Sequence, residues 1–443
     1  MIGAIGRWLD YQLGLARFVQ KNLRKVFPDH WSFILGEVAL YSFVVLVITG
    51  TYLAFFFHPS GQPTAYVGSY GPLQQVEMSQ AYASVLNISF DVRGGLFVRQ
   101  VHHWAALLFV AAIALHMTRV FFTGAYRRPR QLNWLIGVTL LFVAIFSGFT
   151  GYSVVDDLLS GTGLVIGYSV LLSIPFMGAW LAFLLFGGPV PNPSLVPRLY
   201  SIHIMILPGL IAVLLALHLA ILWRQKHTNY PGPQRSNKTI VGTRLWPVYA
   251  TKAFGLFFVI FGILAILGAF VQINPVWLYG PYDPSSVTVG SQPDWYLGWL
   301  EGALRLSPAW EMRIFGHLVP NPFFAGGLLA LLMLAGLYVW PFLDAWITGD
   351  HEIHHVLDRP RDRPVRTAVG VFSITFFVVL LVAGSDDVLA VLFDASIETL
   401  RVVLAALAII LPIVAGVAAY FISRRLSARS PLPGSPPSGD PVG

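Results

Sequence analysis

The sequence contains no cysteine, and only 11% of its 443 residues are charged. Without cysteine, the chain itself cannot form disulfides, thiolate zinc sites, iron–sulfur centres or a haem attached covalently through a C-x-x-C-H motif. A typical soluble domain has about 25% charged residues, so the scarcity of charge excludes a soluble globule of this size. Any redox centre held by this chain alone must therefore be bound through histidine or methionine.

Apolar residues are abundant. Hydrophobic residues make up 56% of the chain, and the mean hydropathy is +0.68. The 28 Lys and Arg residues occur in short clusters between apolar stretches, which is typical of a polytopic membrane protein and not of a nucleic-acid binder. Residues 1–30 carry five cations in an amphipathic context without a cleavable apolar leader, so we expect a cytoplasmic amphipathic segment and no cleaved signal peptide.

Eight apolar stretches reach the length of a membrane-spanning helix, about 20 residues. They lie at roughly 33–57, 98–122, 135–159, 203–223, 250–273, 322–346, 367–384 and 397–422. A ninth stretch, 162–188, is also apolar but contains Pro175 and several glycines. If only eight stretches cross, 22 of the 28 cations fall on one side, whereas a ninth crossing would move 13 of them to the other side.

The sequence therefore predicts an all-α polytopic membrane protein in the cell membrane, with eight transmembrane helices and both termini cytoplasmic. Residues 162–188 are predicted to form a helical hairpin on the outer surface, between helices three and four. Long outer connections usually carry function, and here they cover 58–97, 160–202 and 274–321. The predicted divisions are the N-terminal segment 1–30, a four-helix bundle 31–230, a C-terminal four-helix region 231–426 and a disordered, Ser/Pro/Gly-rich tail 427–443.

Five of the 12 histidines lie inside predicted spans, and four of them form two pairs, one in the second span and one in the fourth. His102 and His116 are fourteen residues apart, which is a rise of ~21 Å on one helix face. His203 and His218 are fifteen apart with Pro208 between them, and a kink or bulge could absorb the extra residue. The two spans run in the same direction, so we expect His102 to face His203 near the outer side and His116 to face His218 near the inner side.

A histidine in the hydrocarbon layer needs a partner, and two pairs at nearly equal spacing argue against isolated packing residues. Two imidazoles from opposing helices are the axial ligands of a six-coordinate haem b, so the pattern predicts two haem b groups. Zinc fits less well, because each pair has no Cys, Asp or Glu nearby. His103 is an alternative to His102 on a less well aligned face.

Glycines in the first and third spans repeat the fourteen-residue step of the second span. Small residues allow a helix backbone to approach a flat macrocycle, so these glycines indicate haem slots at two heights. Arg99 and Arg119, each three residues from a predicted ligand, are placed to pair with haem propionates, or alternatively to snorkel to the interface. The glycines are Gly36, Gly50, Gly137 and Gly151.

Taken together, these features resemble cytochrome b, the haem-bearing subunit of the quinol–cytochrome c reductase (cytochrome bc) complexes, over roughly residues 20–425. The most specific similarity is to the PEWY motif of that family, with Asp in place of Glu. The fifteen-residue spacing is similar to that of chloroplast-type and some Gram-positive members, the chain is not split after the fourth helix, and overall it is most similar to actinobacterial members. The segments that carry the resemblance are the glycine pairs, Arg99-Gln-Val-His102, His116-Met-Thr-Arg119, Arg198 before His203, Ser173-Ile-Pro175-Phe-Met-Gly178 and Pro293-Asp294-Trp295-Tyr296.

The resemblance implies an enzyme subunit that oxidises quinol at the outer face and passes electrons through two b haems to a quinone site on the cytoplasmic side, coupled to proton translocation. It also implies a Rieske iron–sulfur subunit, a membrane c-type cytochrome subunit, a homodimeric complex and association with a terminal oxidase. Asp294 would accept the quinol proton, with a pKa raised by an apolar pocket. Tyr296 would act with Asp294, and further quinone-binding residues would be Tyr152, Gly163, Pro293 and Trp295.

The chain departs from the family pattern on both sides. After Tyr152, where the family has Pro-Trp-Gly, it reads Val155-Asp156-Asp157, so the outer pocket or its partner contact is expected to differ. On the inner side the usual quinone-contacting His and Asp are replaced by Trp223 and Ala253, and we expect His227 or Lys252 to substitute. A cluster of His351, His354 and His355 is either a metal site or a solvated face.

Two other functions remain open from the sequence alone. One is a membrane electron conduit with two haems that serves another oxidoreductase and has no outer quinol site. The other is a transporter whose intramembrane histidines relay protons. The role of Asp294 distinguishes the first alternative from the reductase. A conduit needs no proton acceptor for quinol, and Pro293-Asp294 would then only cap a helix that begins at Trp295.

Overall fold

The computed structural model describes residues 2–286 and 292–429. In this part of the chain eight helices are long and apolar enough to cross a membrane, which confirms the predicted number. The spans are Trp31–Ala54, Gly95–Phe122, Gln131–Ser153, Leu195–Gln225, Leu245–Phe270, Phe323–Thr348, Pro364–Ala383 and Ile397–Ala428.

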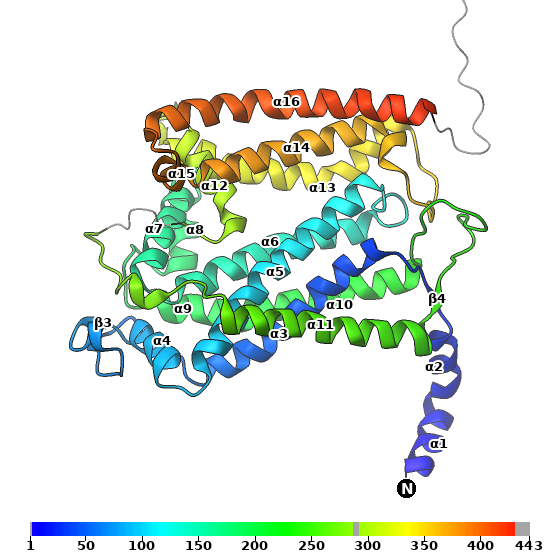
Figure 1. Ribbon diagram of the computed structural model, residues 1–443, viewed down its shortest axis with the longest axis horizontal. Helices are drawn as coiled ribbons and strands as arrows, with labels where there is room; N and C mark the ends of the chain where they lie inside the picture. The colour runs from blue at the N-terminus through cyan, green and yellow to red at the C-terminus, as the bar shows by residue number, and fades with distance from the viewer. Residues whose placement is uncertain (1, 287–291, 430–443) are drawn as a thin grey trace, which may run out of the picture.

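Figure 1 shows these helices lying side by side, with α3, α5, α6, α10 and α11 below α13, α14 and α16. The first four spans are built from α3 (Ile34–Ala54), α5 (Gly95–Phe122), α6 (Gln131–Ser153), and α9 (Leu195–Ser201) continuing into α10 (Leu207–Gln225). The last four are built from α11 (Ala250–Phe270), α13 (Leu329–Thr348), α14 (Pro364–Ala383) and α16 (Ile397–Arg429).

The first four spans pack around an apolar core to which each of them contributes, with residues such as Ala39, Phe109, Val138 and Ile211 fully buried. On the outside of the spans many large apolar side chains are exposed, as expected for helices that face lipid.

The predicted surface hairpin is confirmed. It consists of α7 (Leu158–Leu172) and α8 (Gly178–Phe186), which rise only ~22 Å and ~14 Å along their axes and are too short for a ~30 Å hydrocarbon layer. The chain reverses between them around Pro175 and Phe176, and Phe176 has a positive φ of 63°. Figure 1 shows α7 and α8 at one end of the helices.

The same end carries the other long connections, and the opposite end carries the N-terminal segment (Figure 1). The first group comprises β2 (Pro63–Ala65), β3 (Glu77–Ser79), α4 (Gln80–Phe90), α12 (Trp295–Leu306), β5 (Met312–Ile314), β6 (His317–Val319) and α15 (Asp386–Phe393). The second comprises α1 (Ile2–Leu13), α2 (Leu15–Leu23), β1 (Val26–Phe27) and β4 (Thr243–Arg244). The strands form three antiparallel pairs, β1–β4, β2–β3 and β5–β6.

A buried ionic cluster fixes the end of the molecule opposite the hairpin. Arg366 of α14 donates to Asp344 of α13 at 2.9 Å and to Asp358 at 2.7 Å. The Tyr126 hydroxyl also donates to Asp344, at 2.9 Å, and Arg127 lies 3.1 Å from Asp358. The cluster therefore ties the connections after α5 and after α13 to the two helices beside them.

The predicted tail 427–443 begins inside a helix, since α16 continues to Arg429. Residues 430–443 lie outside the described residues.

Candidate functional site

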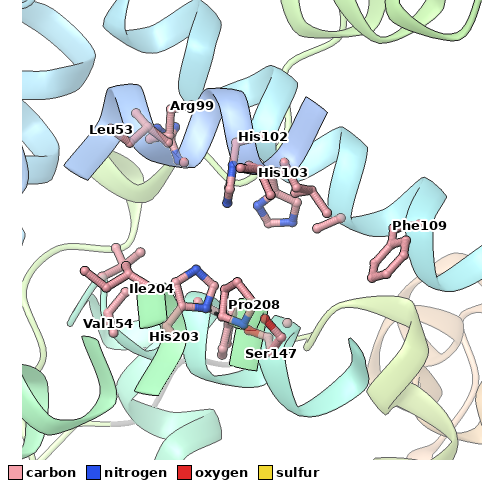
Figure 2. A pocket seen from close by; sticks show the side chains of 18 of the residues that line it. Leu53, Arg99, His102, His103, Phe109, Ser147, Val154, His203, Ile204 and Pro208 are labelled. Atoms are coloured by element: carbon pink, nitrogen blue, oxygen red, sulfur yellow. Dashed lines mark hydrogen bonds between the residues drawn. The ribbon is translucent and has the colours of Figure 1, made fainter. Parts of the chain in front are cut away.

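The four membrane histidines form two facing pairs, as the sequence predicted. The ring centroids of His102 and His203 are 6.4 Å apart, and those of His116 and His218 are 6.5 Å apart. Figure 2 shows His102 and His203 pointing toward one another across a cavity. Both pairs thus join α5 to the fourth span at two heights.

The extra residue between His203 and His218 is absorbed by a π-helical turn, η3 (Ile202–Ile206), between α9 and α10. A π turn accommodates one residue more than the α-helix around it. The expected bulge is confirmed, and it allows a fifteen-residue step to present both rings to α5.

The first pair is oriented by hydrogen bonds to Nδ1. His102 Nδ1 lies 2.9 Å from Thr49 Oγ1, and His203 Nδ1 lies 3.0 Å from the Ser147 carbonyl and 3.2 Å from Thr150 Oγ1. A ring that donates from Nδ1 keeps the lone pair of Nε2 for a metal, as metal-binding histidines usually do. In the described part of the chain His116 Nδ1 and His218 Nδ1 are buried and have no hydrogen-bond partner.

Each of the four predicted glycines lies against one of these rings. An added Cβ would lie 2.5 Å from His203 Cε1 at Gly151, 3.1 Å from His102 Cε1 at Gly50, 3.3 Å from His116 Cε1 at Gly36 and 3.7 Å from His218 Cε1 at Gly137. The glycines line the cavities, as predicted. They also make room for the imidazoles themselves, which the sequence did not reveal.

Each histidine pair borders a largely apolar cavity, and the two cavities have volumes of about 420 Å³ and about 370 Å³. The first is lined by His102 and His203, and the second by His116 and His218. Among the described residues no group of three or more His, Cys, Asp or Glu could hold a bare metal ion. Two facing imidazoles in an apolar cavity fit a flat metalloporphyrin, which needs only two axial ligands from the protein.

Arg99 lines the first cavity and Arg119 the second. The Arg99 guanidinium donates to the Asn274 carbonyl, and that of Arg119 lies 4.3 Å from the centroid of the Phe33 ring. Neither forms an ion pair in the described part of the chain, and the Nε atom of each is buried without a hydrogen-bond partner. Both cations are thus turned toward a cavity, where they suit an anionic group on a bound ligand.

Asp294 occupies the N-cap position of α12, but its side chain does not cap the helix. The carboxylate accepts no hydrogen bond from a backbone N–H of the first turn. Its Oδ1 lies 2.8 Å from His103 Nε2, and its Oδ2 accepts a hydrogen bond of 2.8 Å from the Tyr296 hydroxyl. His103 thus bonds to Asp294 and is not an alternative to His102 at the histidine pair.

The expectation of a raised pKa at Asp294 is wrong. Burial alone raises this pKa, but the facing His103 imidazole and the hydrogen bonds from His103 and Tyr296 outweigh burial and lower the pKa below its ordinary value. The carboxylate is therefore ionised. The pKa of the buried Tyr296 hydroxyl is raised by burial and by the adjacent Asp294 charge, so Tyr296 keeps its proton.

The other predicted outer residues divide into two groups. Tyr152 lines the first cavity together with Asp294 and Tyr296, and its hydroxyl donates to the Leu159 carbonyl at 2.7 Å. The remaining three, Gly163, Pro293 and Trp295, do not line it. Gly163 lies behind the Tyr152 ring, with an added Cβ 3.1 Å from Cε1 of that ring.

The unusual Asp156-Asp157 segment builds the start of the hairpin. Asp157 caps α7 by accepting a hydrogen bond of 2.6 Å from the Ser160 backbone, in a reciprocal capping box. Burial raises the pKa of Asp157 to about 6, and that of Asp156 is also raised by burial. Asp157 of this segment thus serves as the N-cap of α7.

On the inner side, His227 lines the second cavity but Lys252 does not. Lys252 Nζ lies 2.7 Å from Asp29, and its side chain is 54% exposed, so the structure does not bring Lys252 to this cavity. Burial, together with the charges of Arg130, Lys25 and Arg119, lowers the pKa of His227 to about 4 and keeps its ring neutral.

Glu37 and Tyr249 were not predicted as site residues, yet both line the second cavity and they are hydrogen-bonded to each other. A signal was present, because Glu37 is the one charged residue of the predicted first span. An ionisable residue inside a span is a functional candidate by default.

The cluster of His351, His354 and His355 is not a metal site in the described residues. His354 Nε2 lies 2.7 Å from Asp350, and His355 Nδ1 lies 2.7 Å from the Arg130 guanidinium. These histidines help to fix the connection after α13.

Comparisons with known proteins agree with this geometry. A family described as cytochrome b (N-terminal)/b6/petB matches residues 107–281. A cytochrome bc1 complex cytochrome b subunit from Streptomyces coelicolor is 51% identical over 89% of this chain and 73% of that protein. Proteins with the same description from Mycobacterium leprae and Corynebacterium diphtheriae are 51% and 47% identical, over 92% and 96% of this chain and 73% and 78% of their own lengths.

A solved structure described as a hyperthermophilic respiratory Complex III has the same fold. It superposes with a TM-score of 0.69 over 94% of this chain and 99% of that chain, at 19% identity. The similarity to actinobacterial proteins that the sequence suggested is confirmed by the relatives above.

Proposed function

The chain belongs to the cytochrome b subunits of the cytochrome bc1 complex, a family that binds haem b, and on that premise we propose that it carries two b haems and two quinone sites. It is a multi-pass membrane protein. The observation that carries the proposal is that two imidazole pairs, with centroid separations of 6.4 and 6.5 Å, lie at two heights between the same two spans.

His102 and His203 would hold one haem, and His116 and His218 the other. A bound haem supplies a reversible one-electron carrier. The residues of this chain set its position: Thr49, Ser147 and Thr150 orient the first imidazole pair through Nδ1. Arg99 and Arg119 would bind the propionates, because each guanidinium lines a cavity without an acidic partner among the described residues.

Quinol would be oxidised in the first cavity, beside Asp294. The carboxylate is ionised, lies within hydrogen-bond distance of His103 and Tyr296 and lines the same cavity as His102 and His203. Because it is ionised, the carboxylate can accept a proton from a quinol hydroxyl. Tyr296 and His103 would hold it in position, and Tyr152 would line the pocket for the quinol ring.

One electron of each quinol would leave through a partner, since a chain without cysteine cannot hold an iron–sulfur centre, and the other would pass through the two haems. We propose a Rieske iron–sulfur subunit and a membrane c-type cytochrome as these partners, in a dimeric complex that associates with a terminal oxidase. The end that carries α7, α8 and α12 would be the outer face, with both termini cytoplasmic, because this orientation places most cations inside. Quinone would then be reduced in the second cavity, and the two reactions would move protons outward.

Counting haem per chain tests the assigned pairing. Replacing both His102 and His203 by alanine should remove one haem and leave the other, whereas replacing His102 and His218 should remove both. Loss of only one haem from the His102/His218 variant would contradict the pairing. A redox titration of the purified, unsubstituted protein should show two b-type potentials.

The conduit without an outer quinol site is tested through Asp294. Asp294→Asn keeps the shape of the side chain but removes the proton acceptor, so it should slow quinol oxidation by roughly 10²-fold or more and leave the haem spectra unchanged. Unchanged turnover would favour the conduit.

A further inference from the structure

The N-terminal helices α1 and α2 carry large apolar side chains that the rest of the described chain leaves exposed. In Figure 1 the two helices run crosswise to the spans, at the end opposite the hairpin, and α1 extends beyond α11. Exposed apolar side chains that gather in this way usually contact a partner or a membrane. The exposed residues are Ile5, Trp8, Leu13, Phe18, Val19 and Leu23.

In α2 the apolar and the cationic residues lie on opposite faces. Val19 and Leu23 are four residues apart and share one face, with Phe18 beside them. Arg17 and Lys21 are also four apart, and at about 100° per residue both lie roughly opposite Val19. The helix therefore separates apolar from positively charged residues along its length.

Hydrogen bonds hold α1 and α2 in place, so the exposed face is part of the fold. Across the turn between the two helices, Asp10 Oδ1 accepts a hydrogen bond of 2.6 Å from the Ala16 N–H. Near the end of α10, the Trp223 indole donates to Asn22 Oδ1 at 3.1 Å, and the Lys25 ammonium donates to the Trp223 carbonyl at 2.8 Å. The two helices are thus joined to each other and to the fourth span.

The charge of this segment is positive and largely unpaired. Residues 1–25 contain five cations and one acid, Asp10. In the described part of the chain four of these cations are exposed and form no ion pair. They are Arg7, Arg17, Lys21 and Arg24. An anionic surface would therefore find unpaired positive charge along both helices.

These features match the inner surface of a membrane. The two helices rise only ~18 Å and ~14 Å, which is too short to cross a ~30 Å hydrocarbon layer. A helix with Lys and Arg on one face and Trp, Phe or Leu on the other lies in the plane of the interface, and the crosswise direction of α1 and α2 agrees with that plane (Figure 1). The cytoplasmic leaflet also carries anionic lipids, which attract such cations.

We propose that α1 and α2 form a binding surface for anionic phospholipid in the inner leaflet. The apolar residues would enter the acyl region just below the headgroups, while Arg17, Lys21 and Arg24 would bind lipid phosphates. Trp8 would lie at the headgroup level, where tryptophan is enriched. The surface is separate from both histidine cavities, and the proposed function enters only through the orientation that makes this end the inner one.

The test measures the depth of α2 in the full complex, reconstituted into nanodiscs of phosphatidylcholine alone or of phosphatidylcholine mixed equally with phosphatidylglycerol. Because the chain has no cysteine, Val19→Cys introduces a single site for a nitroxide spin label. Gln20→Cys is the matched control, since Gln20 is exposed and turned about 100° from Val19, away from the apolar face. The complex without an added cysteine gives the background labelling of partner subunits.

In discs that contain phosphatidylglycerol, the Val19 label should be shielded from a water-soluble nickel chelate and open to oxygen, and the Gln20 label should be open to the chelate. Replacing both Arg17 and Lys21 by glutamine should lower the ratio of membrane-bound to water-exposed α2 by roughly twentyfold to thirtyfold. Each cation near an anionic surface contributes about a fivefold factor. Added salt should lower the ratio as well, because it screens these charges.

The matched charge control replaces Arg93 and Arg313 by glutamine. Both are exposed at the hairpin end and form no ion pair among the described residues, so the ratio should not change. The label readout requires neither haem nor turnover, and its result is therefore independent of the tests of the proposed function.

Equal access of the nickel chelate to the Val19 and Gln20 labels in phosphatidylglycerol discs overturns the proposal. So does shielding of the Val19 label that is equal in the two lipid compositions, because a protein partner would cover the face whatever the headgroup charge. Shielding that survives replacement of both Arg17 and Lys21 overturns it too.

Discussion

Replacing Gly151 by alanine should weaken the proposed first haem site, and the structure gives the size of the conflict. The added Cβ would lie 2.5 Å from His203 Cε1, whereas carbon atoms in contact prefer about 3.5–4.0 Å. The ring must therefore move by roughly 1 Å. Hydrogen bonds from Nδ1 to Ser147 and Thr150, both on the same helix as Gly151, resist that movement.

Overpacking of this kind costs about 1–3 kcal/mol. If the cost falls on ligand geometry, haem affinity at this site drops by roughly tenfold to a hundredfold, since each 1.4 kcal/mol is a factor of ten. Gly137→Ala is the matched control, because its Cβ would lie 3.7 Å from His218 Cε1, an ordinary contact. Gly50→Ala and Gly36→Ala, at 3.1 and 3.3 Å, should fall between the two.

The assay is haem content per chain by pyridine haemochrome, combined with a redox titration of both b-type components. Gly151→Ala should lose or shift one component only, and Gly137→Ala should keep both. Two haems with equal potentials in both variants, or a greater loss in Gly137→Ala, would contradict this prediction.

Three further predictions use other contacts. Thr49→Val removes the partner of His102 Nδ1 and should lower haem affinity by about 10–100-fold in a haem titration, while Thr51→Val, whose hydroxyl bonds only the Val47 carbonyl, should not. The lowered pKa keeps Asp294 charged to lower pH. In His103→Leu burial is no longer outweighed and raises that pKa, so the acid limb of the pH profile of quinol oxidation should move to higher pH. An unmoved acid limb would contradict this. Arg366→Met strands the buried Asp344 and should cost about 3–5 kcal/mol in unfolding measurements, most of it recovered when Asp344 is also replaced by leucine.

Features with a local pattern could be predicted from the sequence. Apolar length and the distribution of cations determine the eight spans and exclude 162–188 as a ninth. Helix periodicity and span direction determine which histidines face one another, and Pro208 pointed to the bulge that η3 provides. These properties depend on neighbours in the chain or on a single topological rule.

Contacts between distant segments could not be predicted. Asp294 meets His103 across 191 residues, and only that contact reverses the direction of its pKa shift. Glu37 meets Tyr249 across 212 residues, and Lys252 is drawn away from the cavity by Asp29. In each case the partner is set by how the spans pack, which the periodicity of a single helix does not encode.

The π turn at Ile202–Ile206 has a consequence for engineering. The turn contains one residue more than an α-helix would need. Deletion of one residue there would therefore leave an uninterrupted helix whose two imidazoles still face α5. Deletion of two residues would rotate the rest of the helix by about 100° and turn His218 away. Tolerance to single deletions should thus be confined to this turn. The fourth span thus needs both imidazole rings to face α5, and the number of residues between the two histidines can vary by one.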